Sequence, residues 1–310
     1  MADIDRTDAA GLLQDQNINE ILQDAAKSST ALATFRTIPM GTSIAKMPIL
    51  TALPTAQWVT GDTGVKQTSD QKWEKKTLTA EELAVIVPIP ENVFDDSTVG
   101  IWDQVRPRVA QALGKALDEA VFFGTNAPAS FDDSLFEGAD AAGQVYNEGD
   151  SGVDLAEDIN QTWGLVEAVG FDVNVQYASR RIRVRLRGLR DDNNQPIYLE
   201  SLRTDGVDRS LMGEQLTFVQ NGAWDNDVAT LIAGDRQMAI LGVRQDVTYK
   251  ILDQATRTDG AGNVVISLAE SDMIALRAKF RVGFAVADTV TGETDGTTRQ
   301  WPFAALAPGS

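Results

Sequence analysis

The sequence predicts an α+β protein in which one long amphipathic helix is combined with many extended segments. Apolar residues between positions 101 and 121 recur three or four apart, which predicts a helix with one apolar face. Residues 84–89 form a run of apolar, mostly β-branched residues, which is typical of a buried strand. From residue 216 onward, apolar runs of strand length follow one another, so we expect helices early and strands late.

The N-terminal residues 1–34 are expected to form an arm, because they carry too little apolar surface to anchor themselves. Within this arm, apolar residues at helical spacing predict a short helix over residues 17–29. Residues 35–53 and 78–89 are both strand-like and flank a polar, turn-rich stretch, so they predict a β-hairpin. Because a lone two-stranded ribbon is marginally stable in water, the hairpin should dock on its own body or on a neighbour.

Two tryptophans, Trp58 and Trp73, lie near the tip of the predicted hairpin. Their large rings could provide the contact area for docking on a neighbouring molecule. They could equally pack on the core of the same chain, and the sequence does not choose between these two alternatives.

The long helix should follow the Asp-Asp-Ser sequence at residues 95–97, because these residue types cap helix N-termini, and it should end at Gly124. A helix of about 26 residues would be roughly 40 Å long. Pro107 lies inside it and has no amide hydrogen, so the helix should bend or split near Arg106. Lys115, Asp118 and Glu119 are expected to lie off the apolar face, which consists of Ile101, Trp102, Val105, Val109, Leu113, Leu117 and Val121.

Residues 125–158 contain nine acids, no base and several glycines. This composition predicts a long solvated loop and a boundary between domains. A calcium site is the alternative, but these acids lack the regular spacing of a calcium-binding loop.

After a helical pattern at residues 154–169 comes the densest basic run of the chain. Nucleic-acid binding is one interpretation, and ion pairing with acidic surfaces of the same or neighbouring subunits is the other, which the negative net charge favours. Ile182, Val184 and Leu186 alternate as in a strand, while Ile182, Leu186 and Leu189 fit a helix, and the sequence leaves this open. The arginines of the run are Arg180, Arg181, Arg183, Arg185, Arg187 and Arg190.

The composition excludes most enzyme chemistry. The 310 residues include no histidine and no cysteine, which removes Ser-His-Asp and Cys-His machinery and zinc–thiolate sites. The chain has 45 acids and 27 bases, and a net charge of −18 argues against tight, sequence-reading contact with nucleic acid. No apolar run approaches the roughly 18 residues of a membrane span, and no signal-peptide core is present, so we expect no membrane partner.

Several segments, in the same order, resemble the major capsid proteins of tailed phages, which have the Hong Kong 97-type fold. Residues 84–97, AVIVPIPENVFDDS, resemble the strand that leads into that family's spine helix, and residues 101–130 resemble the helix and its exit. Residues 187–198, RGLRDDNNQPIY, resemble a turn of the axial domain, with Asn194 where glycine is usual. Residues 231–252 with 272–290 resemble the paired strands of the peripheral domain, and WPFAALAP resembles the C-terminal tail.

The resemblance implies a Hong Kong 97-type fold with a long spine helix, an extended β-hairpin loop, and peripheral and axial domains. It divides the chain into an N-terminal arm (1–34), extended loop with flanking peripheral-domain strands (35–90), spine helix (91–124), acidic linker (125–153), axial domain (154–240), and peripheral-domain strands with the C-terminus (241–310).

The function that this resemblance implies is structural. Pentamers and hexamers would close into an icosahedral shell around double-stranded phage DNA, in a virion assembled in the cytoplasm of the bacterial host. No catalytic, cofactor-binding or metal-binding residue is expected. The alternatives are an encapsulin-like bacterial compartment and, from another class, a carboxylate-based enzyme or a calcium-binding module.

The implied partners are further copies of the chain, a portal, decoration proteins in some shells, and packaged DNA contacted non-specifically. The hairpin starts near residue 35 and leaves no room for a long N-terminal scaffolding segment, so a separate scaffolding protein is expected unless assembly needs none. The hinge candidate in the spine helix is Pro107. The candidates for contact between subunits are Trp58, Lys66, Trp73, Arg181, Arg183, Arg185 and Arg187.

Some members of that family crosslink a lysine of the extended loop to an asparagine near the C-terminus. Lys66, Lys72, Lys75 or Lys76 could provide the lysine, but no asparagine follows Asn263. We therefore expect no such crosslink.

Overall fold

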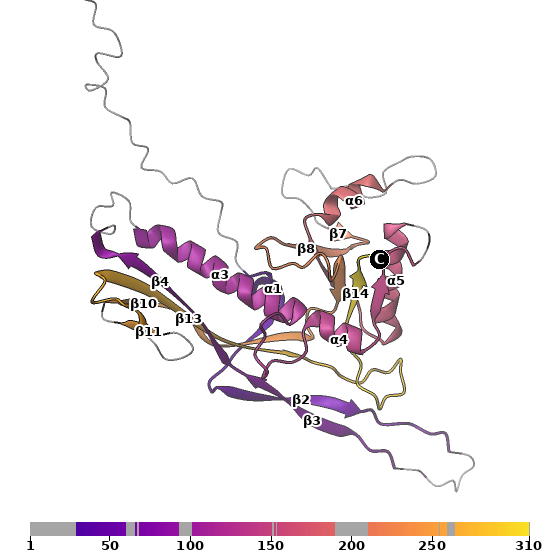
Figure 1. Ribbon diagram of the computed structural model, residues 1–310. Coiled ribbons are helices and arrows are strands. Elements are labelled where there is room, and N and C mark those ends of the chain that lie inside the picture. The colour runs from indigo at the N-terminus through magenta and orange to yellow at the C-terminus, as the bar shows by residue number, and fades with distance from the viewer. Residues whose placement is uncertain are drawn as a thin grey trace, which may run out of the picture.

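The computed structural model describes residues 29–59, 66, 68–92, 101–150, 152, 154–189, 210–253, 255–258 and 264–309. In this part of the chain, a long helix lies along a long sheet, and a hairpin projects away from the body (Figure 1). A second sheet with its own helices stands beside the end of the long helix (Figure 1). Helices and sheets occupy separate layers, which confirms the predicted α+β class.

The first sheet has four strands in the order β1–β10–β13–β4, with β1 parallel to β10 and the other pairs antiparallel. The long helix α3 packs against β4 and β13. The elements are β1 (Arg36–Pro39), β4 (Glu81–Pro90), α3 (Ile101–Phe123), β10 (Ala239–Leu252) and β13 (Met273–Val286).

The second sheet has six strands in the order β5–β14–β9–β6–β8–β7. Its strands are β5 (Val145–Asn147), β6 (Val175–Ser179), β7 (Ser210–Leu211), β8 (Glu214–Val219), β9 (Leu231–Gly234) and β14 (Phe303–Ala307). The helices in this part of the chain are α4 (Leu135–Ala141), α5 (Leu155–Ala168) and α6 (Ile182–Gly188). The C-terminal strand β14 lies between β5 and β9, so the segment 241–310 contributes to both sheets.

The predicted hairpin exists, but its second strand lies before the predicted residues 78–89. β2 (Ile44–Ala52) pairs antiparallel with β3 (Lys72–Thr79), whereas β4 pairs with β13. β3 continues through Ala80 into β4, so one extended stretch belongs first to the hairpin and then to the four-stranded sheet. A small two-stranded sheet is formed by β11 (Thr256–Thr258) and β12 (Val264–Ser267).

The long helix α3 agrees with its predicted C-terminus and apolar face. Gly124 follows it with a φ of 71°, a conformation that glycine adopts without strain. Pro107 lies within the continuous helix, so the predicted split does not occur. The predicted N-cap at residues 95–97 lies outside the described residues. The buried residues of the predicted face are Val109, Leu113, Leu117 and Val121.

An aromatic cluster joins α3 to both sheets. Phe35 contacts the rings of Phe122, Tyr177 and Phe284 at centroid distances of 5.9, 5.7 and 6.3 Å. Phe122 belongs to α3, Tyr177 to the six-stranded sheet and Phe284 to the four-stranded sheet. These rings are buried, so the two sheets share one hydrophobic core.

The prediction of a solvated loop over residues 125–158 was wrong. Ser134 and Glu137 form a capping box at the start of α4, and Leu135 and Ala139 are completely buried. Gly138 lies so close to the Trp301 ring that an added Cβ would be 2.1 Å from it. The abundance of acids concealed these apolar residues, whose spacing of four places them on one helix face.

The structure corrects the prediction for residues 84–89 and decides between helix and strand for the basic run. Residues 84–89 do not form a fully buried strand: β4 is an edge strand whose residues alternate in exposure, and Ile86 is 55% exposed. The ambiguous basic run forms the helix α6, because Ile182 and Leu186 are buried one turn apart while Val184 is exposed.

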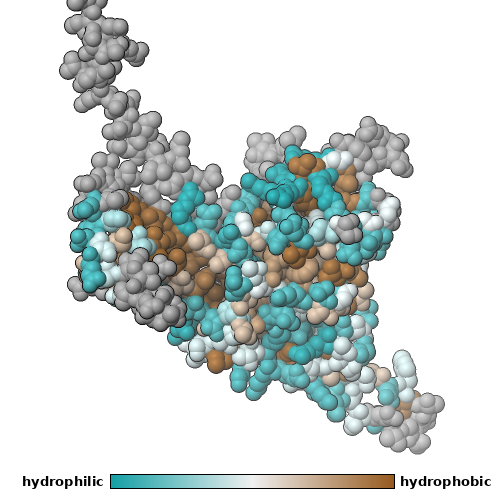
Figure 2. All heavy atoms as spheres, viewed as in Figure 1, coloured by the Kyte–Doolittle hydropathy of each residue, from teal (hydrophilic) through white to brown (hydrophobic). Residues whose placement is uncertain are grey.

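The described chain begins at Ser29, whose side chain caps the short helix α1 (Thr30–Thr34). The helix predicted over residues 17–29 lies outside the described residues, apart from Ser29 itself. The apolar patch in Figure 2 runs along the seam between α3 and β4, where Val85, Val87 and Val105 are only partly buried.

Candidate assembly surfaces

The root of the β2–β3 hairpin is fixed by an ion-pair network. The Lys76 ammonium lies 2.6 Å from a carboxylate oxygen of Asp132 and 2.7 Å from one of Asp288. Asp132 also accepts a hydrogen bond from the backbone N–H of Val286, at 3.0 Å. Because these charges are mostly buried, the network holds β3 against β13 and the loops around it.

The other strand of the hairpin is fixed by backbone contacts. The carbonyl oxygen of Leu50 accepts from the Thr289 hydroxyl at 3.2 Å, and the N–H of Leu53 donates to Gly296 at 2.9 Å. Beyond Leu53 the hairpin projects away from both sheets (Figure 1). The hairpin therefore has a fixed root and a projecting tip.

The described residues near the tip do not pack on the core of their own chain. Trp58 is fully exposed, and Trp73 is 62% exposed. Lys66, the third hairpin residue predicted to contact a neighbour, is also exposed. Of the two alternatives left open by the sequence, packing of these tryptophans within the subunit is therefore wrong.

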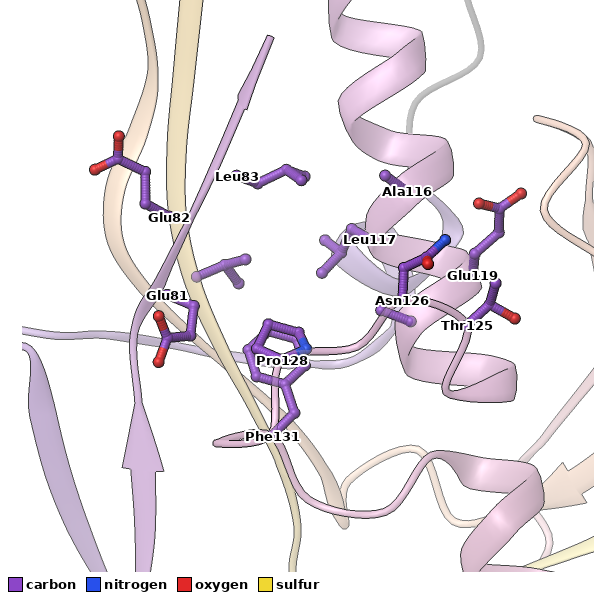
Figure 3. A pocket seen from close by; sticks show the side chains of 12 residues that line it. Glu81, Glu82, Leu83, Ala116, Leu117, Glu119, Thr125, Asn126, Pro128 and Phe131 are labelled. Atoms are coloured by element: carbon purple, nitrogen blue, oxygen red, sulfur yellow. The ribbon is translucent and has the colours of Figure 1, made fainter. Parts of the chain in front are cut away.

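A hollow of about 220 Å³ lies between α3, β4 and the loop that follows α3. Leu83 of β4 and Leu117 of α3 point toward one another across it, and Pro128 and Phe131 close one end (Figure 3). Ala116 lines the α3 side. The floor of the hollow is thus formed by apolar side chains from three segments that are distant in sequence.

Polar groups surround the mouth of this hollow. Glu81 accepts a hydrogen bond from the Ser130 hydroxyl at 2.7 Å, and Glu82 is paired with Lys279. The Glu119 carboxylate lies 3.4 Å from the Lys115 ammonium. The hollow therefore combines an apolar floor with a rim rich in acceptor oxygens.

The arginines of α6 contact groups of their own subunit. Arg185 pairs with Glu148, and one of its N–H groups donates to that carboxylate at 2.9 Å. Arg183 stacks over the Phe218 ring at 5.5 Å from its centroid. Of these contacts, the Arg185–Glu148 pair agrees with the ion-pairing interpretation.

Two other arginines of the set complete this surface. Arg187 donates to the backbone oxygen of Arg183 at 3.3 Å. Arg181 lines a polar hollow of about 330 Å³ beside Trp224, Asp225 and Asp227. A contact of Arg181, Arg183, Arg185 or Arg187 with a neighbouring subunit stays a prediction, and Arg190 lies outside the described residues.

Asp118 is a side chain whose burial the sequence did not predict. It was expected off the apolar face of α3, yet it is completely buried. Its carboxylate accepts from the Ser29 hydroxyl, from the backbone N–H groups of Thr30 and Ala31 at 2.8 and 3.1 Å, and from the Asn221 amide at 2.7 Å. One side chain thus joins α3 to the N-terminal segment and to the loop after β8.

Burial raises the pKa of Asp118, and its four hydrogen bonds lower it, with burial the larger effect. Burial also raises the pKa of the nearby Tyr177 hydroxyl, which donates to Thr34 at 2.9 Å. Helical spacing could have located Asp118, because it follows the buried Gly114 by four residues and precedes the buried Phe122 by four.

A calcium site was the alternative interpretation of the acids in residues 125–158. Within the residues that the structure describes, no group of three or more acids could hold a metal ion. In the same residues, no helix is long and apolar enough to cross a membrane.

Comparison with known proteins places this architecture. Residues 9–290 match the family model described as the phage capsid family. The major capsid protein of Staphylococcus phage 80alpha is 27% identical over 282 residues, covering 90% of this chain and 82% of that protein. A solved structure from Microbacterium phage Oxtober96 has a TM-score of 0.86 and 48% identity, and covers 99% of this chain and 100% of that one. One from Mycobacterium phage Adephagia has a TM-score of 0.85 and 35% identity, covering 100% and 99%.

The chain belongs to the phage capsid family and has the Hong Kong 97-type fold. It is a major capsid protein, a structural component of the virion that assembles with its own copies into a shell. The encapsulin-like alternative is not favoured by these relatives.

Proposed function

We propose that the subunit assembles as pentamers and hexamers that close into an icosahedral shell around double-stranded DNA. The observation that carries this arrangement is the hairpin, whose root is fixed by Lys76 while its tip presents Trp58 to solvent. An exposed aromatic tip on a fixed arm gains stability only by contact with another surface. In the proposed shell, each hairpin lies over a neighbouring subunit.

In this arrangement, α3 is the spine helix, β2–β3 is the extended loop, and the four-stranded sheet forms the peripheral domain. The six-stranded sheet, with α5 and α6, forms the axial domain. This grouping is supported by the sheet order, in which β1, β10, β13 and β4 form one sheet, β2 and β3 form the hairpin, and β11 and β12 pair separately. It adds the C-terminal strand β14 to the axial domain.

The proposed partners follow from the same role. The shell is filled through a portal, carries decoration proteins in some phages, and assembles in the bacterial cytoplasm with a separate scaffolding protein. The net charge of −18 supports contact with packaged DNA that is weak and non-specific. The role is non-enzymatic, and it is supported by the lack of histidine and cysteine in the sequence.

Deletion of residues 57–71 tests the arrangement, because this segment precedes Lys72 and lies beyond the paired strands. The variant should give a folded subunit, with the thermal unfolding midpoint of the wild type, that forms no stable shells. The measurements are size-exclusion chromatography, electron microscopy and thermal unfolding by circular dichroism. Normal shells from the deletion variant would refute the docking role of the hairpin.

A second measurement separates the proposed DNA container from a protein-filled compartment. The ultraviolet absorbance ratio of shells purified from infected cells should show packaged nucleic acid. Shells that contain only protein cargo would contradict the proposal.

A further inference from the structure

The hollow between α3 and β4 has the properties of a receptor for one large side chain. Its volume of about 220 Å³ lies below the roughly 300–1,000 Å³ that is typical of small-molecule sites. Its floor is formed by apolar side chains, including Leu83, Leu117 and Phe131 (Figure 3). Glu81 and Asn126 add oxygen atoms at the rim, which can accept a hydrogen bond from a donor at the edge of an aromatic ring.

Among the residues that the structure describes, Trp58 is the side chain that best fits such a hollow. Its ring is fully exposed and is followed by the exposed Val59. An indole ring has a large apolar surface and a single N–H donor, so it prefers an apolar floor with an acceptor at the edge. Trp73 is a weaker candidate, because it lies within β3 opposite Leu50 and is partly covered.

The exposure of Trp58 favours an occupant from a second copy of the chain. Ala52 pairs with Lys72, and Lys72 lies nine residues before Glu81 along an extended stretch, or about 30 Å. Trp58 lies six residues beyond Ala52, which is a reach of at most about 20 Å even if the chain turned back. In the structure, the hairpin projects away from both sheets and leaves Trp58 fully exposed, so Trp58 does not occupy the hollow of its own subunit (Figure 1).

We propose that Trp58 of one subunit inserts into the hollow between α3 and β4 of a neighbouring subunit. The indole ring packs against Leu83, Leu117 and Phe131, and its N–H donates to an oxygen at the rim. The apolar patch that runs along the same α3–β4 seam supports this direction of approach (Figure 2). The proposal rests on the proposed shell and names the surface on which its hairpin docks.

The lack of native cysteine allows a direct test by disulfide formation. Shells of the variant Trp58→Cys with Ala116→Cys are oxidised and analysed on a non-reducing denaturing gel. Because a disulfide requires Cα atoms within about 7 Å, covalent oligomers form only if the tip lies at the hollow. The control pair is Trp58→Cys with Val184→Cys, since Val184 is exposed on α6, which lies away from α3 and β4 (Figure 1).

The expected result is a ladder of covalent oligomers for the first pair and monomer for the control pair. Intact shells of the first pair that give only monomer overturn the proposal, and so does an equal ladder from both pairs. A ladder from Trp73→Cys with Ala116→Cys, without one from the Trp58 pair, would also overturn it.

A second variant covers the case in which shells need the Trp58 ring itself. Ala116→Phe fills the hollow and leaves Trp58 intact, so it should reduce the yield of shells about tenfold, as loss of a central interface residue does. Ala112→Phe is the matched control, because Ala112 is exposed one turn away on α3 and does not line the hollow.

Equal yields from Ala116→Phe and Ala112→Phe contradict the proposed docking of Trp58. These outcomes differ from failure of the proposed function. If the wild-type chain forms no shells, the shell arrangement itself is wrong. If wild-type and Ala112→Phe shells form and the first cysteine pair stays monomeric, only the inference about Trp58 is wrong.

Discussion

Asp118 is the residue at which α3, the N-terminal segment and the loop after β8 are joined. Four donors surround its carboxylate, and all of them point at acceptor oxygens. In Asp118→Asn, an amide nitrogen replaces one of these acceptors and faces a donor. Since a buried donor without a partner costs about 1–3 kcal/mol, we expect that loss in the free energy of unfolding. Denaturant unfolding of the unassembled subunit measures it, with the exposed Asp140→Asn as control.

The same variant should change how stability depends on pH. Burial raises the pKa of Asp118 above its ordinary 3.8, so the folded state binds this proton more tightly than the unfolded chain. Proton binding to Asp118 therefore stabilises the folded state. This stabilisation is fully present below the pKa of Asp118 in the unfolded chain and is lost as pH rises through its pKa in the folded state. The difference in melting temperature between wild type and Asp118→Asn should therefore narrow from pH 4 toward neutral pH. A difference that widens over this range would show that the hydrogen bonds outweigh burial and lower this pKa.

At the scale of elements, the Lys76 network decides how the hairpin leaves the subunit. Lys76→Met removes the cation and leaves Asp132 and Asp288 close together without it, although Arg299 still lies 3.5 Å from Asp288. Because the three side chains are mostly buried and the two carboxylates lose a partner, we expect a loss of about 1–3 kcal/mol in the free energy of unfolding. The remaining Arg299 contact keeps the loss below the roughly 3–5 kcal/mol of a fully buried broken pair. The exposed Lys46→Met on β2 is the matched control and should be near neutral. Equal stability of the two variants would show that the network does not hold the hairpin.

The elements that could be predicted from the sequence are those that depend on patterns among neighbouring residues. Helical spacing predicted the apolar face of α3, and alternating runs predicted the hairpin, because both patterns are visible in neighbouring residues. The same local view failed for α4, where charge composition concealed the buried Leu135 and Ala139. It also failed for Asp118, because the donors that make its burial tolerable are 88 and 103 residues away. The place of β14 beside β9 is likewise set by distant partners.

At the scale of the whole molecule, α3 is the connection between the two sheets. The helix packs on β4 and β13. In its C-terminal part, Asp118 contacts the loop after β8, and Phe122 contacts the ring of Tyr177 in β6. A change in the shape of α3 would therefore alter contacts with both sheets. The described helix has one residue that weakens its backbone ladder, Pro107, which is exposed and lacks an amide hydrogen.

This position predicts a role for Pro107 when precursor shells expand. Pro107→Ala restores one backbone hydrogen bond, and proline is about 3 kcal/mol less favourable than alanine inside a helix, so the variant should stiffen α3. We expect its precursor shells to assemble normally but to expand more slowly or incompletely. Light scattering and electron microscopy of particle diameter, before and after a change of pH or temperature that triggers expansion, measure this. Ala112→Ser, an exposed change on the same helix, controls for substitution as such. Expansion of Pro107→Ala shells at the wild-type rate and to the wild-type diameter would show that α3 does not flex at Pro107.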